Sequence, residues 1–320
     1  MFWAIHERFG NAAPAAALAL FALSSPAYAG PVTVFGGAIG AITGCDAEGP
    51  LNLSAPSGTV EGKDGCFFNN GGGTGKGGYG GRAGNGEVGA ITSADSVQPN
   101  FATGHIAATT ATSTYRTTVR ITGPSPFVLV SVLTEADAAM VFEVNPGGFF
   151  TGRLGAEVNL NGSGLQEELE VSAEFGKALK INRSGNNIFG TPTITAGGVV
   201  FDGGIVASPL FSVPTNVDLS LFMSISANAI AGSSGFFGPS GLVAGLASGT
   251  TDAMSTLSLP STGFVFRLPE GFSAFSADGV IVDNRWAFAP PVDPVPEPGM
   301  LVLLSAGLLG VAVLRRSRKS

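Results

Sequence analysis

Charged residues are scarce in this sequence: Asp, Glu, Lys and Arg make up 12% of its 320 residues, against about a quarter in an average globular protein. This shortage disfavours long solvated helices. Histidine, tryptophan and cysteine are rarer still, with two of each. Glycine is plentiful, with 48 residues where roughly 22 would be average. The composition therefore points away from an α-helical protein.

The charge that is present is mostly acidic. Leaving out Glu7 and Glu297 from the 23 acidic residues, and Arg8 with the four C-terminal cations from the 16 basic ones, gives the region between the two ends a net charge of −10. A region this acidic has no cluster of basic residues that could bind a polyphosphate, so we expect no nucleic-acid partner.

Residues for histidine-based catalysis are almost absent. His105 is the only histidine beyond the first 29 residues. No serine stands in a Gly-x-Ser-x-Gly elbow, and one histidine cannot build a His-rich zinc site. The sequence therefore predicts no catalytic residue, no metal and no cofactor, and we expect the protein not to be an enzyme.

Carboxylates offer an alternative chemistry, because glycosidases need only a pair of acids. The acids that are close together in sequence are Glu135 with Asp137, and Glu167 with Glu168 and Glu170. Alternation places the second set mainly on the solvated face of a strand. Loop acids that could be considered for calcium are Asp46, Glu48, Asp64 and Asp278. None of them belongs to an Asp-x-Asn-x-Asp-Gly loop, so we expect no dedicated metal site.

The first 29 residues fit a cleaved secretory signal. An apolar stretch runs from Ala12 to Leu23, and Ala27-Tyr28-Ala29 has the small-x-small pattern that a signal peptidase reads. Cleavage is expected before Gly30. An uncleaved anchor is the alternative, but the apolar stretch is shorter than the roughly 20 residues that a spanning helix needs.

Residues 290–320 combine three features in a fixed order. A proline-rich spacer leads into the motif Val295-Pro296-Glu297-Pro298, and an apolar, charge-free segment at 299–314 follows as the expected transmembrane helix. The chain closes with a basic tail at 315–320, whose cations are Arg315, Arg316, Arg318 and Lys319. These cations should hold the last residues in the cytoplasm. A plain tail anchor would explain the apolar segment and the cations, but not a Pro-Glu-Pro beside the membrane.

This ending resembles the PEP-CTERM sorting signal of Gram-negative bacteria. Val295 to Pro298, the apolar segment and the Arg315-Arg316 pair stand where the family has them. The resemblance implies recognition by a membrane-embedded exosortase, transient anchoring in the inner membrane and cleavage near the motif. It also implies transfer of the remaining chain to the cell surface or the medium, and an association with exopolysaccharide and biofilm.

Residues 30–104 form a glycine-rich region that we expect to be irregular. Cys45 and Cys66 are the only cysteines, and export to an oxidising compartment predicts a disulfide between them. Such a link would stabilise the fold by roughly 3 kcal/mol in the chain-entropy account. The tract at 69–89 contains Gly75-Lys76 but lacks the other residues of a phosphate loop. We expect this tract to be a flexible, exposed loop.

Residues 105–289 show the period-two alternation of strands with one buried face. Tyr115, Thr117, Val119 and Ile121 alternate with polar or charged residues, and clusters of Gly, Pro, Asn and Ser separate such segments. The pattern predicts an all-β body, a sandwich of the jelly-roll or immunoglobulin type.

Two further segments bear on this fold. The strongest competing helix is Leu165 to Lys180, but strict alternation through Phe175 and an internal Gly176 favour a strand there. Residues 252–286 also resemble, more loosely, the terminal strands of many proteins with this sorting tail. That second resemblance implies a shared sandwich architecture.

Taken together, these features predict an exported, non-enzymatic cell-surface or extracellular-matrix protein that an exosortase sorts. Its expected partners are signal peptidase and exosortase as processing enzymes, the membrane before processing, and exopolysaccharide. The alternative is a secreted carbohydrate-active enzyme or glycan-binding module that uses paired carboxylates on a β-sandwich.

Overall fold

The computed structural model describes residues 32–40, 51–55, 59–69, 74–98, 105–233, 236–238, 241–243 and 245–288. Every regular element in these ranges is a β-strand. None of them contains a helix long and apolar enough to cross a membrane. The prediction of an all-β body is confirmed for the described residues of 105–289. The described residues of 30–104, which we expected to be irregular, also form strands, β1 to β5. The helix expected at 299–314 lies outside the described ranges.

The first of two large sheets has eight strands. The spatial order of its main path is β10 (Lys180–Gly185), β9 (Ser163–Glu174), β8 (Gly148–Leu160), β14 (Asp218–Ser233), β6 (His105–Thr122), β1 (Val32–Gly40) and β2 (Leu51–Ala55). The eighth strand, β19 (Ser273–Ser276), pairs with β6 off this path. All these pairings are antiparallel, an arrangement that allows one face to be buried and the other solvated.

The second sheet has nine strands and is also antiparallel. Its main path is β11 (Thr191–Thr195), β12 (Gly198–Ala207), β7 (Phe127–Val144), β17 (Gly245–Ser258), β5 (Glu87–Gln98), β4 (Thr74–Gly84) and β3 (Val60–Asn69). The two strands off this path, β13 (Phe211–Pro214) and β18 (Phe266–Arg267), both pair with β7. Two short hairpins complete the strands: β15 (Phe236–Gly238) with β16 (Gly241–Val243), and β20 (Ile281–Val282) with β21 (Arg285–Trp286).

The long strands are connected in the manner of a jelly roll. Along the chain, β5, β6, β7 and β8 alternate between the two sheets, and β9 and β12 then extend them beside β8 and β7. Near the end of the chain, β14 inserts between β8 and β6, and β17 inserts between β7 and β5. These insertions produce the interlocked Greek keys of a double-sheet jelly roll.

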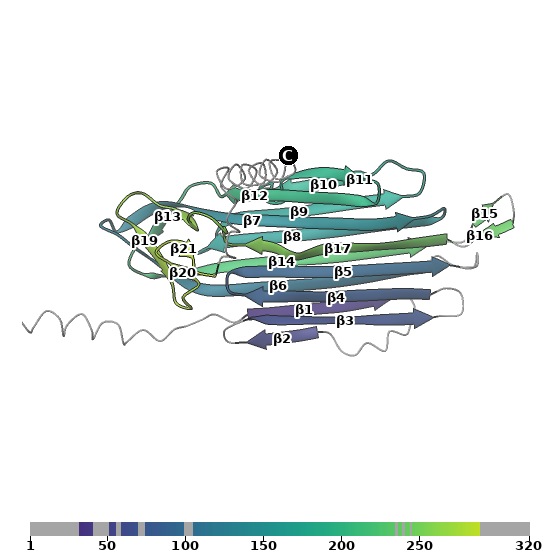
Figure 1. Cartoon of the computed structure of the whole chain (residues 1–320), viewed down its shortest axis with the longest axis horizontal. Helices are drawn as coiled ribbons and strands as arrows, with labels where there is room; N and C mark the ends of the chain where they lie inside the picture. The colour runs from purple at the N-terminus through teal and green to yellow at the C-terminus, as the bar shows by residue number, and fades with distance from the viewer. Residues whose placement is uncertain are drawn as a thin grey trace, which may run out of the picture. The chain divides into compact units, whose positions relative to one another are not determined.

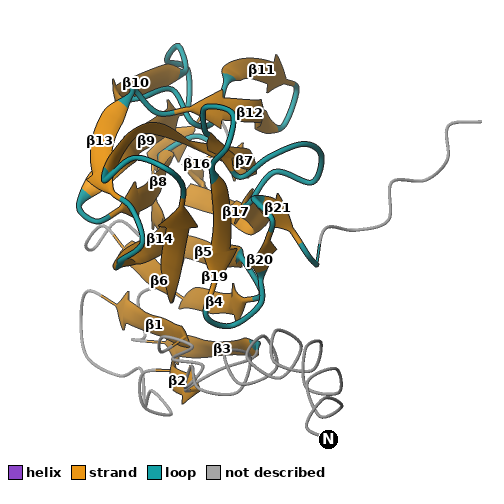
Figure 2. Ribbon diagram, turned by 90° about the vertical axis from the view of Figure 1, so that its left-hand side faces the viewer, coloured by secondary structure: helices purple, strands orange, loops and turns teal. Residues whose placement is uncertain are grey.

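The two sheets face each other and share one core. A cluster of buried side chains joins Ala107, Phe150 and Ala229 of the first sheet to Ala94 and Ala247 of the second. Figure 2 shows the two layers, with β8, β14 and β6 in one and β7, β17 and β5 in the other. The alternation seen in the sequence therefore separates this shared interior from two outer faces.

In the middle of the sandwich, side-chain hydroxyls of one sheet reach the backbone of the other. Ser113 on β6 donates from Oγ to the carbonyl oxygen of Gly89 on β5 at 2.6 Å. Thr251 on β17 donates from Oγ1 to the carbonyl oxygen of Asn228 on β14 at 3.0 Å. Because Ser113 and Thr251 are fully buried, these bonds satisfy hydroxyl groups that would otherwise destabilise the core.

Two glycines make this close approach possible. A Cβ atom on Gly249 would collide with the ring of Phe150, which crosses from the opposite sheet. A Cβ atom on Gly152 would lie 2.6 Å from Oγ1 of Thr251 and 2.7 Å from Sδ of Met140. Since interiors are close-packed, the missing side chains set the spacing of the sheets here.

The prediction of a flexible, exposed loop for the glycine tract is wrong over its described part. Thr74–Gly84 forms β4, which pairs with both β3 and β5, and Tyr79 within it is buried. A Cβ atom on Gly78 would lie 2.8 Å from Oγ of Ser93. Glycine here permits close packing, which composition alone does not distinguish from flexibility. The described residues up to Phe288 belong to one compact unit.

The segment that competed as a helix is a strand, as predicted. Ser163–Glu174 forms β9 between β8 and β10, and Leu169 and Val171 point into the core. The strand ends in a turn at Gly176, whose φ of 75° suits glycine.

Candidate functional site

The C-terminal cap, residues 259–288, closes one end of the sandwich. In it, Phe266 of β18 lies opposite Val132 of β7, and Ala274 of β19 lies opposite Ile121 of β6. The cap is therefore bonded to both sheets. Figure 1 shows β19, β20 and β21 together at that end, next to β13.

Asn284 is the polar centre of the cap. Its side chain accepts from the backbone N–H of Phe266 at 3.0 Å and donates to the carbonyl oxygen of the same residue at 2.8 Å. Its own N–H donates to the carbonyl of Ala274 at 2.8 Å, and its carbonyl accepts from Val265 at 2.9 Å. The side chain of a buried asparagine thus bonds backbone groups of Phe266 that a neighbouring strand would otherwise pair.

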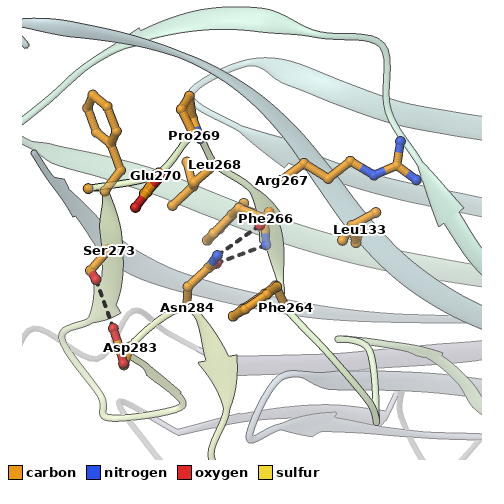
Figure 3. Close-up of a pocket in the computed structure, with 12 residues that line it drawn as sticks. Leu133, Phe264, Phe266, Arg267, Leu268, Pro269, Glu270, Ser273, Asp283 and Asn284 are labelled. Carbon is orange, nitrogen blue, oxygen red and sulfur yellow. Dashed lines mark hydrogen bonds between the residues drawn. The ribbon is translucent and has the colours of Figure 1, made fainter.

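A pocket of about 510 Å³ opens between the cap and Leu133 of β7. Figure 3 shows the rings of Phe264 and Phe266 and the side chain of Arg267 around it. Its volume is typical of small-molecule sites. However, Asn284 bonds Phe266, and Ser273 donates to Asp283 at 2.8 Å. These polar groups therefore hold the cap together.

A buried tyrosine joins the cap to the first sheet. Tyr115 on β6 donates from its hydroxyl to Oδ2 of Asp278 at 2.5 Å, and Asp278 also accepts from Oγ of Ser276 at 2.6 Å. Burial, followed by the charge of Asp278 and its hydrogen bond, raises the pKa of Tyr115 well above its usual range. Asp278, a candidate calcium ligand in the sequence, thus has structural hydrogen-bond partners.

Three acidic residues, called the acidic trio below, gather on the outer face of the second sheet. Asp137 on β7 lies directly opposite Asp202 on β12, and Glu135 lies two residues from Asp137 on the same strand face. Burial raises the pKa of Asp137, and the charges of Asp202 and Glu135 raise it further.

The geometry of the acidic trio bears on the carboxylate alternative. Directly opposed strand residues have Cβ atoms about 4.5–5.5 Å apart, so Asp137 and Asp202 supply two neighbouring carboxylates on one face, which is the residue pair that a glycosidase needs. The sequence indicated Glu135 with Asp137 but missed Asp202, because only strand pairing brings Asp202 close. Among the described residues, no group of three or more His, Cys, Asp or Glu side chains could hold a metal ion.

The three residues of the second acidic set, Glu167, Glu168 and Glu170, differ in their burial and in their partners. Glu168 is exposed and Glu170 forms an ion pair with Arg153 at 2.7 Å. Glu167, by contrast, is 1% exposed, pairs with Arg183 at 2.5 Å and accepts from the N–H of Phe189 at 2.9 Å. The expectation of a solvated face is therefore wrong for Glu167. Its side chain points inward, because it lies on the same face of β9 as the buried Leu165 and Leu169.

Where the middle parts of β6 and β14 pair, the outer face of the first sheet presents hydroxyl and amide groups. On β6, Thr110 and Thr112 lie opposite Asn228 and Ser226 of β14. The next residue across from Ser226 is Gly155 of β8, so no large side chain stands at that point. Such a surface offers many donors and acceptors on a rigid frame.

The predicted processing residues lie outside the described ranges. They are Ala27, Ala29, Gly30, Val295, Pro296, Glu297, Pro298, Arg315, Arg316, Arg318 and Lys319. The disulfide stays a prediction, since Cys45 and the side chain of Cys66 are also outside them, although the backbone of Cys66 belongs to β3. His105 begins β6, as expected for a residue at the start of a strand.

The described body defines an all-β, double-sheet protein. Comparison with protein families finds the PEP-CTERM protein-sorting motif at residues 294–319. The predicted sorting signal is thereby confirmed, and a motif of this kind implies export, C-terminal anchoring and processing by an exosortase. Comparisons with curated proteins and with solved structures found no match.

Proposed function

We propose that the protein is a non-enzymatic component of the cell surface or extracellular matrix, associated with exopolysaccharide or biofilm. The observation that carries the proposal is the sorting motif at residues 294–319 joined to a body in which every described regular element is a strand. A rigid β-sandwich suits a displayed structural component, because its two outer faces are available for contacts while the interior stays closed.

The order of features in the tail supports delivery by an exosortase. Prolines at 290, 291, 294, 296 and 298 remove backbone donors and favour extended conformations. An extended segment suits a protease, and the apolar residues at 299–314 would hold it at the membrane. Cleavage near the motif would then free the body.

Intact-mass spectrometry of membrane, surface and medium fractions tests this delivery. Surface protein should lack residues 1–29 and the tail beyond the motif at 295–298, and a disulfide would lower its mass by two hydrogens. A full-length C-terminus found only in the membrane fraction would contradict release. Deletion of the gene should also weaken biofilm cohesion, and an unchanged biofilm would count against the matrix role.

The acidic trio supports a second candidate, a carbohydrate-active protein. The supporting observation is the opposed pair Asp137 and Asp202, with the pKa of Asp137 raised. If the pair is catalytic, purified protein should shorten the host's exopolysaccharide, and Asp137→Asn and Asp202→Asn should each abolish this. Exopolysaccharide of unchanged length in the presence of the parent protein would exclude that activity.

A further inference from the structure

Exposed apolar side chains concentrate at the end of the sandwich that carries the cap. Eight of the fifteen large exposed hydrophobic residues in the described ranges lie there: Phe127, Leu129, Leu210, Val217, Phe264, Phe275, Val282 and Phe288. Large exposed apolar groups that gather in one place mark interaction sites more often than chance. The described chain also leaves the body at this end, at Phe288.

Four of these residues, called the exit patch below, lie on β7 or in the loops beside it: Phe127, Leu129, Leu210 and Phe264. Phe127 and Leu129 alternate with the buried Val128 and Val130 on β7, so they share the outward face. Leu210 immediately precedes β13, which pairs with that part of β7. Phe264 lines the pocket together with Leu133 of β7. Their exposures are 61%, 56%, 65% and 51%.

Two arginines flank the exit patch. Arg267 lies opposite Ser131 of β7, and the guanidinium of Arg285 lies 4.7 Å from the centre of the Phe264 ring. Neither forms an ion pair within the described part of the chain. Guanidinium groups bind phosphate in a bidentate manner. Apolar side chains next to arginines therefore match a phospholipid surface, with its acyl chains below a layer of phosphates.

The length of the tail brings a bilayer within reach of this patch. Residues 289–298 separate Phe288 from the apolar segment at 299–314, and ten extended residues span at most about 35 Å. We propose that the exit patch docks on the membrane surface while the tail is inserted, which would orient the body with its cap towards the bilayer before cleavage. This inference rests on the anchoring step of the proposed function.

Tryptophan fluorescence in the full-length protein tests the docking. Leu129→Trp reports on the exit patch, Phe127→Trp repeats the measurement beside it, and Ile194→Trp, at an equally exposed site on β11, is the matched control. Each variant is reconstituted into phosphatidylethanolamine–phosphatidylglycerol vesicles, with or without brominated acyl chains. The emission added by the Leu129→Trp substitution should fall by roughly half, because docked rings lie about 5–10 Å into the headgroup and acyl boundary. The control should match the parent.

The outcomes separate the two proposals. If the protein floats with the vesicles but neither patch variant is quenched more than the control, the docking is wrong and the anchoring stands. A blue-shifted emission without quenching would mean that a protein segment or a second copy covers the patch, which also overturns docking on lipid. If the protein does not float with the vesicles, anchoring and docking fail together.

Discussion

The middle of the sandwich and the C-terminal cap are held together by different interactions. In the middle, glycine and small neutral residues let the sheets approach until Ser113 and Thr251 bond across the interface. In the cap, the amide of Asn284 bonds the backbone of Phe266, and the carboxylate of Asp278 accepts from Tyr115 of the first sheet. The middle should therefore be sensitive to added volume, and the cap to lost hydrogen bonds.

The difference follows from strand geometry. Long paired strands satisfy their own backbone groups, so the middle needs only complementary surfaces. At the end of a sandwich the ladders stop, and the backbone groups of irregular segments need other partners. Asn284 supplies such partners to Phe266.

The largest effect is expected from Asn284→Ala. The change leaves the buried N–H and carbonyl of Phe266 without their side-chain partner and should lower the free energy of unfolding by about 3 kcal/mol. Urea unfolding measures this. Asn182→Ala is the control, since Asn182 is exposed and bonds Glu170 at 3.3 Å. A similar loss in both variants would show that the cap is not held by Asn284.

A larger side chain should destabilise the middle of the sandwich. Gly249→Ala places a methyl group against Phe150 and should cost about 2 kcal/mol. Gly197→Ala is the matched control, because nothing lies within 4 Å of the position of its Cβ. Thermal unfolding compares the two variants, and an equal melting temperature would contradict the close approach of the sheets.

Tyr115→Phe removes the hydrogen bond between the first sheet and the cap, with little change in the shape of the side chain. Losing the hydrogen bond to Asp278 should cost about 1 kcal/mol near pH 7. The folded pKa of Tyr115 is raised above its unfolded value, so its contribution is present below about pH 10 and is lost as the pH rises further. Unfolding measured between pH 8 and about 11 should show a steeper alkaline loss in the parent than in the variant. Parallel pH profiles would rule out this role.

The smallest effect is expected on the outer face, where solvent screens charge. Asp137→Asn removes a carboxylate facing Asp202 and should stabilise the protein by roughly 0.5 kcal/mol at neutral pH. Because the folded pKa of Asp137 is raised, the parent loses stability as the pH rises through that pKa. The advantage of the variant should therefore vanish below about pH 4. Thr193→Ala, on exposed β11, serves as a control without such pH dependence.

Much of the body could be predicted from alternation. The segments around Tyr115, Leu169 and Leu221 show period two, and all three lie in long strands with these residues buried. The same rule extended to Glu167 would have predicted its burial, but a charged residue was assumed to be solvated. Its partner Arg183 comes from a neighbouring strand, which alternation alone does not reveal.

The role of the glycine tract was not predictable from composition. Glycine is common both in flexible loops and in strands that a neighbouring layer approaches closely. Only the pairing of Thr74–Gly84 with β3 on one side and β5 on the other distinguishes the two cases. The acidic trio is similar, because Asp137 and Asp202 are distant in sequence and meet through strand pairing.

The sequence by itself determined the strands with alternating side chains beyond residue 105 and the sorting motif, because alternation is a local property and the motif at 294–319 is a linear signal. The tertiary structure decided which strands pair, how close the sheets lie and which side chains meet at the cap. These features depend on contacts between distant segments, such as Tyr115 with Asp278. Packing and hydrogen bonding select such contacts, and no short stretch of sequence contains them.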